Sequence, residues 1–308
     1  MNFGLLPAAD TFLDSLLPPG SAHASAAAVD CDGTVIRGDI GEAMLYDQLE
    51  RGLFRTSPAR IWSDHPQRDL LEHLHAQASR GADGAPHHAR AREDLGKILL
   101  GTYTGLLAEG RTTRACADIV RLWAGYSEED VRALAQDALR RAEAAPPGNT
   151  LFAGRAVARG VRFIQPVVDL VRAMLRRGYR VLAVSGSSQW SVEAVFARIG
   201  LPARDVAGID LESSGGILSG LPRAPVPVGE GKVEVFRSRM GEDPLVVISD
   251  SIFDLPLFGR ARRAKVLVSG DTAEAEAFFR SAGVIPDDTW HVCISPPELR
   301  EEERACRM

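Results

Sequence analysis

The 308-residue sequence has no long apolar run, no excess of basic residues and no Lys or Arg in its first 20 residues. No segment approaches the roughly 20 consecutive apolar residues that a membrane-spanning helix needs, so we expect no membrane partner. The net charge of -5 argues against nucleic acid as a partner, because nucleic-acid binding needs a basic surface. Residues 1–20 place no Lys or Arg ahead of their short apolar patches, so we expect a cytoplasmic protein.

Cysteine and lysine are both scarce. The four cysteines show no close pairing and no Cys-x-x-Cys spacing, so we expect reduced, structural thiols at Cys31, Cys116, Cys293 and Cys306. Only three of the 36 basic residues are lysines. With 45% hydrophobic and 25% charged residues, the chain has an ordinary globular composition and is long enough for two domains.

The most informative segment is Val-Asp-Cys-Asp-Gly-Thr-Val at 29–35, which follows the apolar run 26–29. Alternate residues of a strand point to opposite faces, so Asp30 and Asp32 are expected on one side of the strand end. Two charges this close repel each other strongly unless a divalent cation or a phosphoryl group lies between them. An aspartate can also attack phosphorus, with its neighbour as general acid and base.

The segment admits two other interpretations. A calcium-binding EF-hand loop starting at Asp30 needs Gly at its sixth position and Glu at its twelfth, where this chain has Val35 and Gly41. The sequence therefore excludes an EF-hand. A purely structural turn stays open on this segment alone.

Polar groups also follow other predicted strands. Ser185 follows an apolar run and precedes Gly186, where a hydroxyl and free backbone N–H groups suit an anionic oxygen. Lys232 opens a predicted helix, and its ammonium can neutralise a phosphoryl oxygen. Asp250 and Asp254 form a second carboxylate pair one helical turn apart. The alternatives are that a serine after Gly186 only caps the next helix and that Lys232 is a surface residue.

From Arg155 onward, short apolar strands alternate with amphipathic helices. Such strands are usually buried on both faces, as in a parallel sheet covered by helices, so we expect an α/β, Rossmann-like doubly wound core. Ligands bind such sheets at the carboxyl ends of the strands. Strands are predicted at 180–185, 245–249 and 265–269, helices at 167–177, 189–199, 231–240 and 253–260, and a hairpin at 209–221 with its turn at Gly215-Gly216.

The segment after the first strand has a different pattern. It contains long amphipathic stretches without convincing strands, which predicts an all-helical cap over 38–150 inserted into a core made of 1–37 and 151–308. Both connections of this cap lie near the strand ends, so it can act as a lid. Helices are expected at 40–53, 69–78, 89–107, 113–123 and 128–144, and the charged segment 296–308 is a candidate exposed helix.

Five of the seven histidines fall in this insertion: His65, His73, His75, His87 and His88. At spacing i,i+2, His73 and His75 point to different helix faces, and the pair at 87–88 follows a Gly/Pro-containing stretch. We therefore expect solvated histidines rather than a metal site.

Taken in order, these motifs resemble the haloacid dehalogenase superfamily in its phosphatase branch. The resemblance rests on DCDGTV at 30–35, Ser185 in VSGSS, Lys232, and SDSIFD at 249–254, and it covers nearly the whole chain. The motif spacing and the place of the insertion are similar to the phosphoserine phosphatase subgroup, with phosphorylcholine phosphatases as more distant relatives. Ser249 departs from the pattern, because the family usually has Gly before the metal aspartate.

The resemblance implies roles for the acidic residues. Asp30 would form an aspartyl-phosphate, and Asp32 would protonate the leaving oxygen and then activate water. The carboxylates of Asp30 and Asp250 and the main-chain carbonyl of Asp32 would hold Mg²⁺. Asp254 would orient Lys232 or a metal-bound water. True dehalogenases lack the second aspartate, so Asp32 favours phosphate ester over carbon–halogen chemistry.

For the substrate, the resemblance implies that Ser185, Lys232 and the amides near Gly33 and Gly186 bind the phosphoryl oxygens, while Thr34 fixes the turn. Asp39 or Glu42 could receive a substrate amine, although capping and stabilising the helix that starts near Ile40 is the favoured role for both. A basic cap residue, Arg114 or Arg121, could receive a substrate carboxylate.

Three functions stay open from the sequence. The first is a Mg²⁺-dependent phosphatase acting on a small-molecule phosphate ester such as phosphoserine or phosphocholine. The second is a phosphotransferase or mutase that passes the same aspartyl-phosphate to another acceptor. The third is a non-catalytic phosphate-binding protein that keeps the fold, which the intact acidic set disfavours.

Overall fold

The structure is a computed structural model, and it describes residues 3–16, 25–55, 61, 65, 67–79, 86–146 and 148–295. Its centre is a seven-stranded sheet in the order β1-β13-β12-β11-β2-β7-β8, in which every neighbouring pair is parallel. The predicted doubly wound α/β core is confirmed. The strands are β1 (Gly4–Leu5), β2 (Ala26–Val29), β7 (Arg180–Ser188), β8 (Val206–Ile209), β11 (Val246–Ser249), β12 (Ala264–Ser269) and β13 (Trp290–Ile294).

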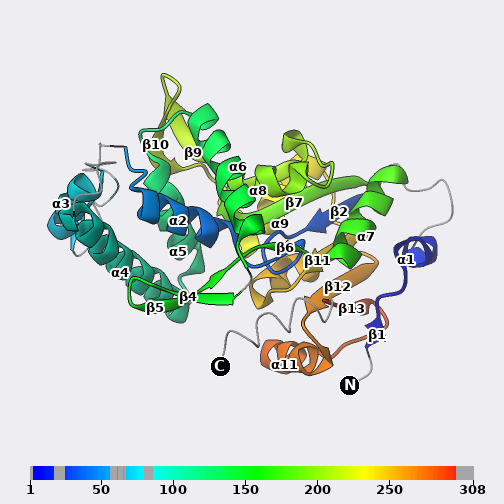
Figure 1. Cartoon of the computed structure of the whole chain (residues 1–308). Coiled ribbons are helices and arrows are strands. Elements are labelled where there is room, and N and C mark those ends of the chain that lie inside the picture. The colour runs from blue at the N-terminus through cyan, green and yellow to red at the C-terminus, as the bar shows by residue number, and fades with distance from the viewer. Residues whose placement is uncertain are drawn as a thin grey trace.

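Helices cover both faces of this sheet (Figure 1). Along β2, Ala27 and Val29 pack into one apolar layer, whereas Ala26 and Ala28 pack into the other. Because neither face meets water, the strands are continuous apolar runs rather than alternating ones. The helices of the core are α1 (Ala9–Leu16), α7 (Gln165–Arg176), α8 (Gln189–Ala197), α9 (Glu230–Met240), α10 (Leu255–Phe258) and α11 (Thr272–Ala282).

The insertion after β2 forms a second layer of helices at one end of the sheet, on the left in Figure 1. Its own apolar cluster includes Leu45, Leu71 and Leu95. The helix α6 also packs against α8 of the core, and Arg132 pairs with Glu193 across that contact at 2.9 Å. The cap helices are α2 (Ile40–Arg51), α3 (Arg68–Ala78), α4 (Pro86–Ala108), α5 (Thr112–Val120), which continues as a 3-10 turn η2 (Arg121–Trp123), and α6 (Glu128–Ala144).

The two connections of the insertion meet each other. They pair as the antiparallel strands β3 (Ile36–Arg37) and β6 (Arg162–Phe163). Gly38 has φ +92°, and a Cβ there would lie 2.7 Å from the carbonyl oxygen of Gly160. Only glycine fits this close approach, so entry and exit of the cap are fixed side by side at the edge of the sheet.

Several details differ from the sequence prediction. A hairpin that the sequence does not predict follows the cap helices across the predicted boundary at residue 150. Its strands are β4 (Gly148–Phe152) and β5 (Arg155–Arg159), and its Phe152 and Val157 pack on the cap cluster. The predicted hairpin in the core is confirmed as β9 (Leu211–Ser214) and β10 (Ile217–Pro222), but Ile209 belongs to β8. The predicted helix at 253–260 is a 3-10 turn η4 (Ile252–Asp254) followed by α10, and η3 (Ala203–Asp205) precedes β8.

Two of the five cap histidines correct the solvation prediction. His75 is fully buried, with its ring 5.0 Å from that of Phe54, and His88 is buried with Nδ1 2.8 Å from the Gln77 carbonyl oxygen. Both occupy helix faces that pack inside the cap, so burial rather than hydration is their setting. His73 is exposed as expected. The predicted C-terminal helix and Cys306 lie outside the described residues.

None of the helices in the described ranges is long and apolar enough to cross a membrane.

Candidate active site

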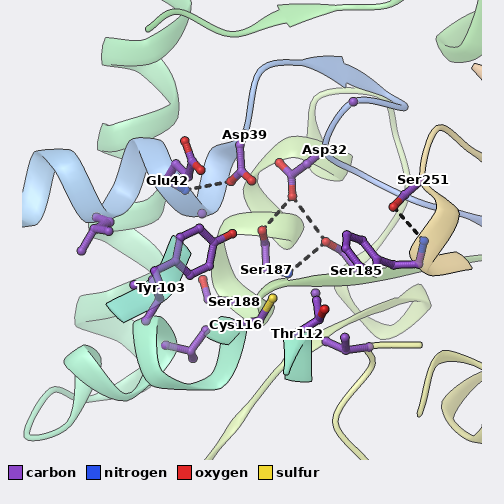
Figure 2. A pocket seen from close by; sticks show the side chains of 18 of the residues that line it. Asp32, Asp39, Glu42, Tyr103, Thr112, Cys116, Ser185, Ser187, Ser188 and Ser251 are labelled. Carbon is purple, nitrogen blue, oxygen red and sulfur yellow. Dashed lines mark hydrogen bonds between the residues drawn. The ribbon is translucent and has the colours of Figure 1, made fainter. Parts of the chain in front are cut away.

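A cavity of about 380 Å³ lies between the carboxyl ends of the central strands and the cap. The core side is lined by residues that follow β2 and β11, by the last residues of β7 and by Lys232 of α9. The cap side is lined by α2, α4 and α5, and Figure 2 shows side chains from both sides. Parallel strands end at the same sheet edge, which is why segments more than 200 residues apart meet here. The cavity brings together Asp30, Asp32, Gly33, Ser185, Gly186, Lys232, Asp250 and Asp254.

The Asp30 carboxylate is buried directly after β2. Its Oδ1 accepts the backbone N–H of Cys31 at 2.8 Å and the Lys232 ammonium at 3.0 Å. Burial raises the pKa of Asp30 well above its usual range, and the negative charges of Asp254 and Asp250 add to this while Lys232 opposes it. Asp30 is therefore held in a fixed orientation in a site with excess negative charge.

Asp32 is held by both the cap and the core. Its Oδ1 accepts the backbone N–H of Ile40, the first residue of α2, at 2.7 Å. Its Oδ2 accepts the Ser187 hydroxyl at 2.7 Å, and the Ser185 hydroxyl lies 3.5 Å away (Figure 2). Burial raises the pKa of Asp32, although these hydrogen bonds oppose the shift. A raised carboxyl pKa suits a group that has to carry a proton.

Ser187 is a site residue that sequence reasoning missed. The prediction that a serine after Gly186 caps the next helix is confirmed at Ser188, whose hydroxyl accepts the N–H of Ser191, and this leaves Ser187 free to contact Asp32. Ser185 lies two residues earlier on β7, and its hydroxyl accepts the N–H of Ser187 at 3.1 Å. The VSGSS segment thus places one serine beside Asp32 and uses another to start the helix.

Lys232 lies between two carboxylates. Its ammonium is 2.7 Å from Asp254 Oδ2 and 3.0 Å from Asp30 Oδ1, and all three side chains are buried. Despite the cost of burial, the two carboxylates raise the pKa of Lys232, so the ammonium is charged. Among the described residues, it is the one Lys or Arg that lines the cavity. A phosphoryl group entering the cavity would meet this positive charge beside Asp30.

Asp250 lies against the turn after β2. Its Oδ1 accepts the Thr34 hydroxyl at 3.0 Å, and a Cβ at Gly33 would overlap its carboxylate. Gly33 has φ +70°, so this position is both left-handed and sterically closed to any side chain. Burial raises the pKa of Asp250 to about 6, and Asp254 contributes to the shift while the Thr34 hydrogen bond opposes it.

This donor set fits a hard divalent cation. Two buried carboxylates, at Asp30 and Asp254, and two half-buried ones, at Asp32 and Asp250, stand against one ammonium, and oxygen ligands are those that Mg²⁺ prefers. Within the described ranges no group of three or more His, Cys, Asp or Glu side chains is arranged to hold a metal.

The cap residues divide into two groups. Asp39 caps α2 by accepting the N–H of Glu42 at 2.8 Å, and Glu42 accepts the hydroxyl of Tyr46 at 2.9 Å. Asp39 and Glu42 nevertheless both line the cavity, and burial together with Asp32 raises the pKa of each. Arg114 and Arg121 are not among the described residues that line the cavity, and both pair with Asp118.

Comparison with known proteins assigns the chain to a family. A model of the haloacid dehalogenase-like hydrolases matches residues 85–259, more than half of the chain. The search of curated proteins found no match to the chain. A conserved, functionally unknown protein from Anaerococcus prevotii has a similar structure, with TM-score 0.64 and 16% identity over 91% of this chain and 90% of that one. A protein of unknown function from Bordetella pertussis has TM-score 0.55 and 18% identity over 87% and 98%.

At these identities, the two structures support the shared fold, and the family assignment rests on the matched model. The match includes the segment that carries Ser185 and Lys232 and runs past Asp254. The chain belongs to the family of haloacid dehalogenase-like hydrolases.

Proposed function

We propose that the protein is a Mg²⁺-dependent phosphomonoesterase that hydrolyses a small-molecule phosphate ester through an aspartyl-phosphate on Asp30. The observation that carries this proposal is the convergence of Asp30, Asp32, Lys232 and Asp250 on one cavity. The two aspartates after β2 have separate hydrogen-bond partners, so they are set up for different roles.

In the first step the Asp30 carboxylate attacks phosphorus, and the bond from phosphorus to the ester oxygen breaks. Asp32 gives its proton to that oxygen, so the alcohol leaves neutral. Lys232 lies 3.0 Å from Asp30, where its charge stabilises the phosphoryl oxygens as they gain negative charge. Backbone N–H groups near Gly33 and Gly186 are the further donors proposed for these oxygens.

In the second step a water molecule attacks the phosphorus of the aspartyl-phosphate, and Asp32 accepts the proton that the water loses. Phosphate leaves and Asp30 is regenerated. Asp30, Asp250 and the main-chain carbonyl of Asp32 would hold Mg²⁺, which supplies positive charge that offsets the carboxylates and the phosphoryl group. The cap covers the cavity, so α2, α4 and α5 limit access of bulk water during the reaction.

The test is release of inorganic phosphate from p-nitrophenyl phosphate with Mg²⁺ present. We expect the Asp30→Asn variant to lose the activity, because an amide oxygen cannot form the acyl phosphate. Asp210→Asn is the matched control, since Asp210 pairs with Arg223 and does not line the cavity. Undiminished turnover by Asp30→Asn would overturn the assignment, and phosphate recovered on an added alcohol instead of free would show transfer rather than hydrolysis.

A further inference from the structure

The part of the cavity away from the phosphate site is built by the cap. Its lining is mostly apolar or aromatic and includes Met44, Leu100, Tyr103, Leu107, Ile119 and Trp123. This region has to hold the alcohol portion of the ester, because Asp30 and Lys232 occupy the other end. The alcohol therefore meets a largely apolar surface, and the few charges near it decide which esters bind.

The ionisable side chains near the alcohol are acidic. Asp39 and Glu42 line this region, and Figure 2 shows the Tyr103 ring pointing toward the side of the cavity that holds Asp39. The one cationic side chain among the described lining residues is Lys232, which two carboxylates already hold.

The nearby arginines do not change this balance. Arg114 lies 2.7 Å from Asp118 and Arg121 lies 3.4 Å from it, and Arg114 lines a separate small cavity beside His65. A substrate carboxylate in the main cavity would thus lose its hydration, face Asp39 and Glu42, and find no described arginine to bind. A cation would instead meet two carboxyl groups and the aromatic side chains of Tyr103 and Trp123.

Resting on the phosphatase function proposed above, we propose that the substrate is a phosphate monoester whose alcohol carries an organic cation and no carboxylate. Asp39 and Glu42 select the cation, and the apolar walls of α2, α4 and α5 contact its hydrocarbon part. Esters of this class are phosphorylated amino alcohols and their quaternary ammonium analogues. The inference favours phosphocholine-like esters over phosphoserine, two substrates that the sequence leaves open.

The test uses esters that differ in charge but little in shape. Choline phosphate and 3,3-dimethylbutyl phosphate differ only in a nitrogen cation replaced by a neutral carbon, and phosphoserine adds a carboxylate to an amino alcohol. We expect kcat/KM to be at least about tenfold higher for choline phosphate than for its neutral analogue, and lowest for phosphoserine. Equal rates for the matched pair, or a higher rate for phosphoserine, would overturn the inference.

Cap variants connect that preference to the two carboxylates. We expect Glu42→Gln and Asp39→Asn each to lower the choline-to-neutral ratio several-fold, and Asn still caps a helix, so α2 is preserved. Asp47→Asn is the control on the same helix, because Asp47 pairs with Arg51 outside the cavity and its variant should keep the ratio. Hydrolysis of p-nitrophenyl phosphate without any preference contradicts this inference alone, whereas failure to hydrolyse any ester contradicts the proposed function as well.

Discussion

The Ser249 hydroxyl lies 2.6 Å from Asp254 Oδ2, the same oxygen that accepts the Lys232 ammonium at 2.7 Å. Ser249 is buried at the end of β11 and also lies 3.4 Å from Asp30 Oδ2. The family resemblance predicts glycine at this position, so this hydroxyl is an additional group beside the candidate nucleophile. The hydroxyl links the orientation of Asp254, and through Asp254 that of Lys232, to β11, the strand that Asp250 directly follows.

We expect Ser249→Ala to lower kcat about tenfold or more, because a hydrogen bond to a charged group contributes roughly 1.5–3 kcal/mol. The KM for the ester should change less than kcat, since Ser249 acts by positioning Asp254 and Lys232. Steady-state hydrolysis of p-nitrophenyl phosphate measures both constants. The matched control is Ser238→Ala on α9, whose hydroxyl bonds only the Val235 carbonyl outside the cavity. Wild-type kcat in Ser249→Ala would contradict a positioning role.

Strands buried on both faces could be predicted closely from the sequence. The run at 245–249 appears as β11 (Val246–Ser249), because a strand without a solvent face has to be apolar throughout. The exposed hairpin β4–β5 could not be predicted this way. Asn149, Thr150 and Leu151 are all exposed and pair only with β5, so no burial pattern marks them as a strand. The strand β13 is not among the predicted strands, because the half-buried His291 interrupts an otherwise apolar run.

The candidate site shows the same division. Asp30, Asp32 and Asp250 could be predicted because each directly follows, or lies just beyond, an apolar strand. The partners of Asp32 could not be predicted, because they come from the end of β7 and from the first residue of α2, which meet only in the folded chain. Ser187 is 155 residues away in sequence, and the Ile40 contact uses a backbone N–H, which has no sequence signature.

Gly33 provides a test of how Asp250 is placed. We expect Gly33→Ala to displace the Asp250 carboxylate, because the new methyl group would overlap it and the left-handed backbone adds about 1 kcal/mol of strain. A displacement of this kind should lower the Mg²⁺-stimulated activity roughly 100-fold. The measurement is phosphate release as a function of Mg²⁺ concentration.

Gly215→Ala is the matched control for that experiment. Gly215 has φ +59° but faces open space at the β9–β10 turn, so the backbone strain is similar and no side chain is displaced. We expect this variant to lose some stability and keep its activity. If Gly33→Ala retained the Mg²⁺ response of the wild type, the close contact with Asp250 would have no role in catalysis.

His75 predicts a pH dependence of stability. Burial lowers the pKa of His75, because the charged imidazolium would lose its hydration inside the cap. The unfolded chain binds a proton at this residue below about pH 6.5, whereas the folded chain does so only at lower pH. Stability is therefore fully present above about pH 6.5 and falls as the solution is acidified toward the lowered folded pKa.

We expect His75→Leu to flatten this acid slope, because leucine has no proton to bind and its side chain suits the contact with Phe54. The measurement is the free energy of unfolding in urea at several values between pH 8 and pH 5. His73→Leu is the control on the same helix, since His73 is exposed and its ring contacts only Gln77. The slope, unlike the absolute stability, does not depend on how well leucine packs at either position. An unchanged slope in His75→Leu would mean that His75 gains its proton equally well in the folded cap.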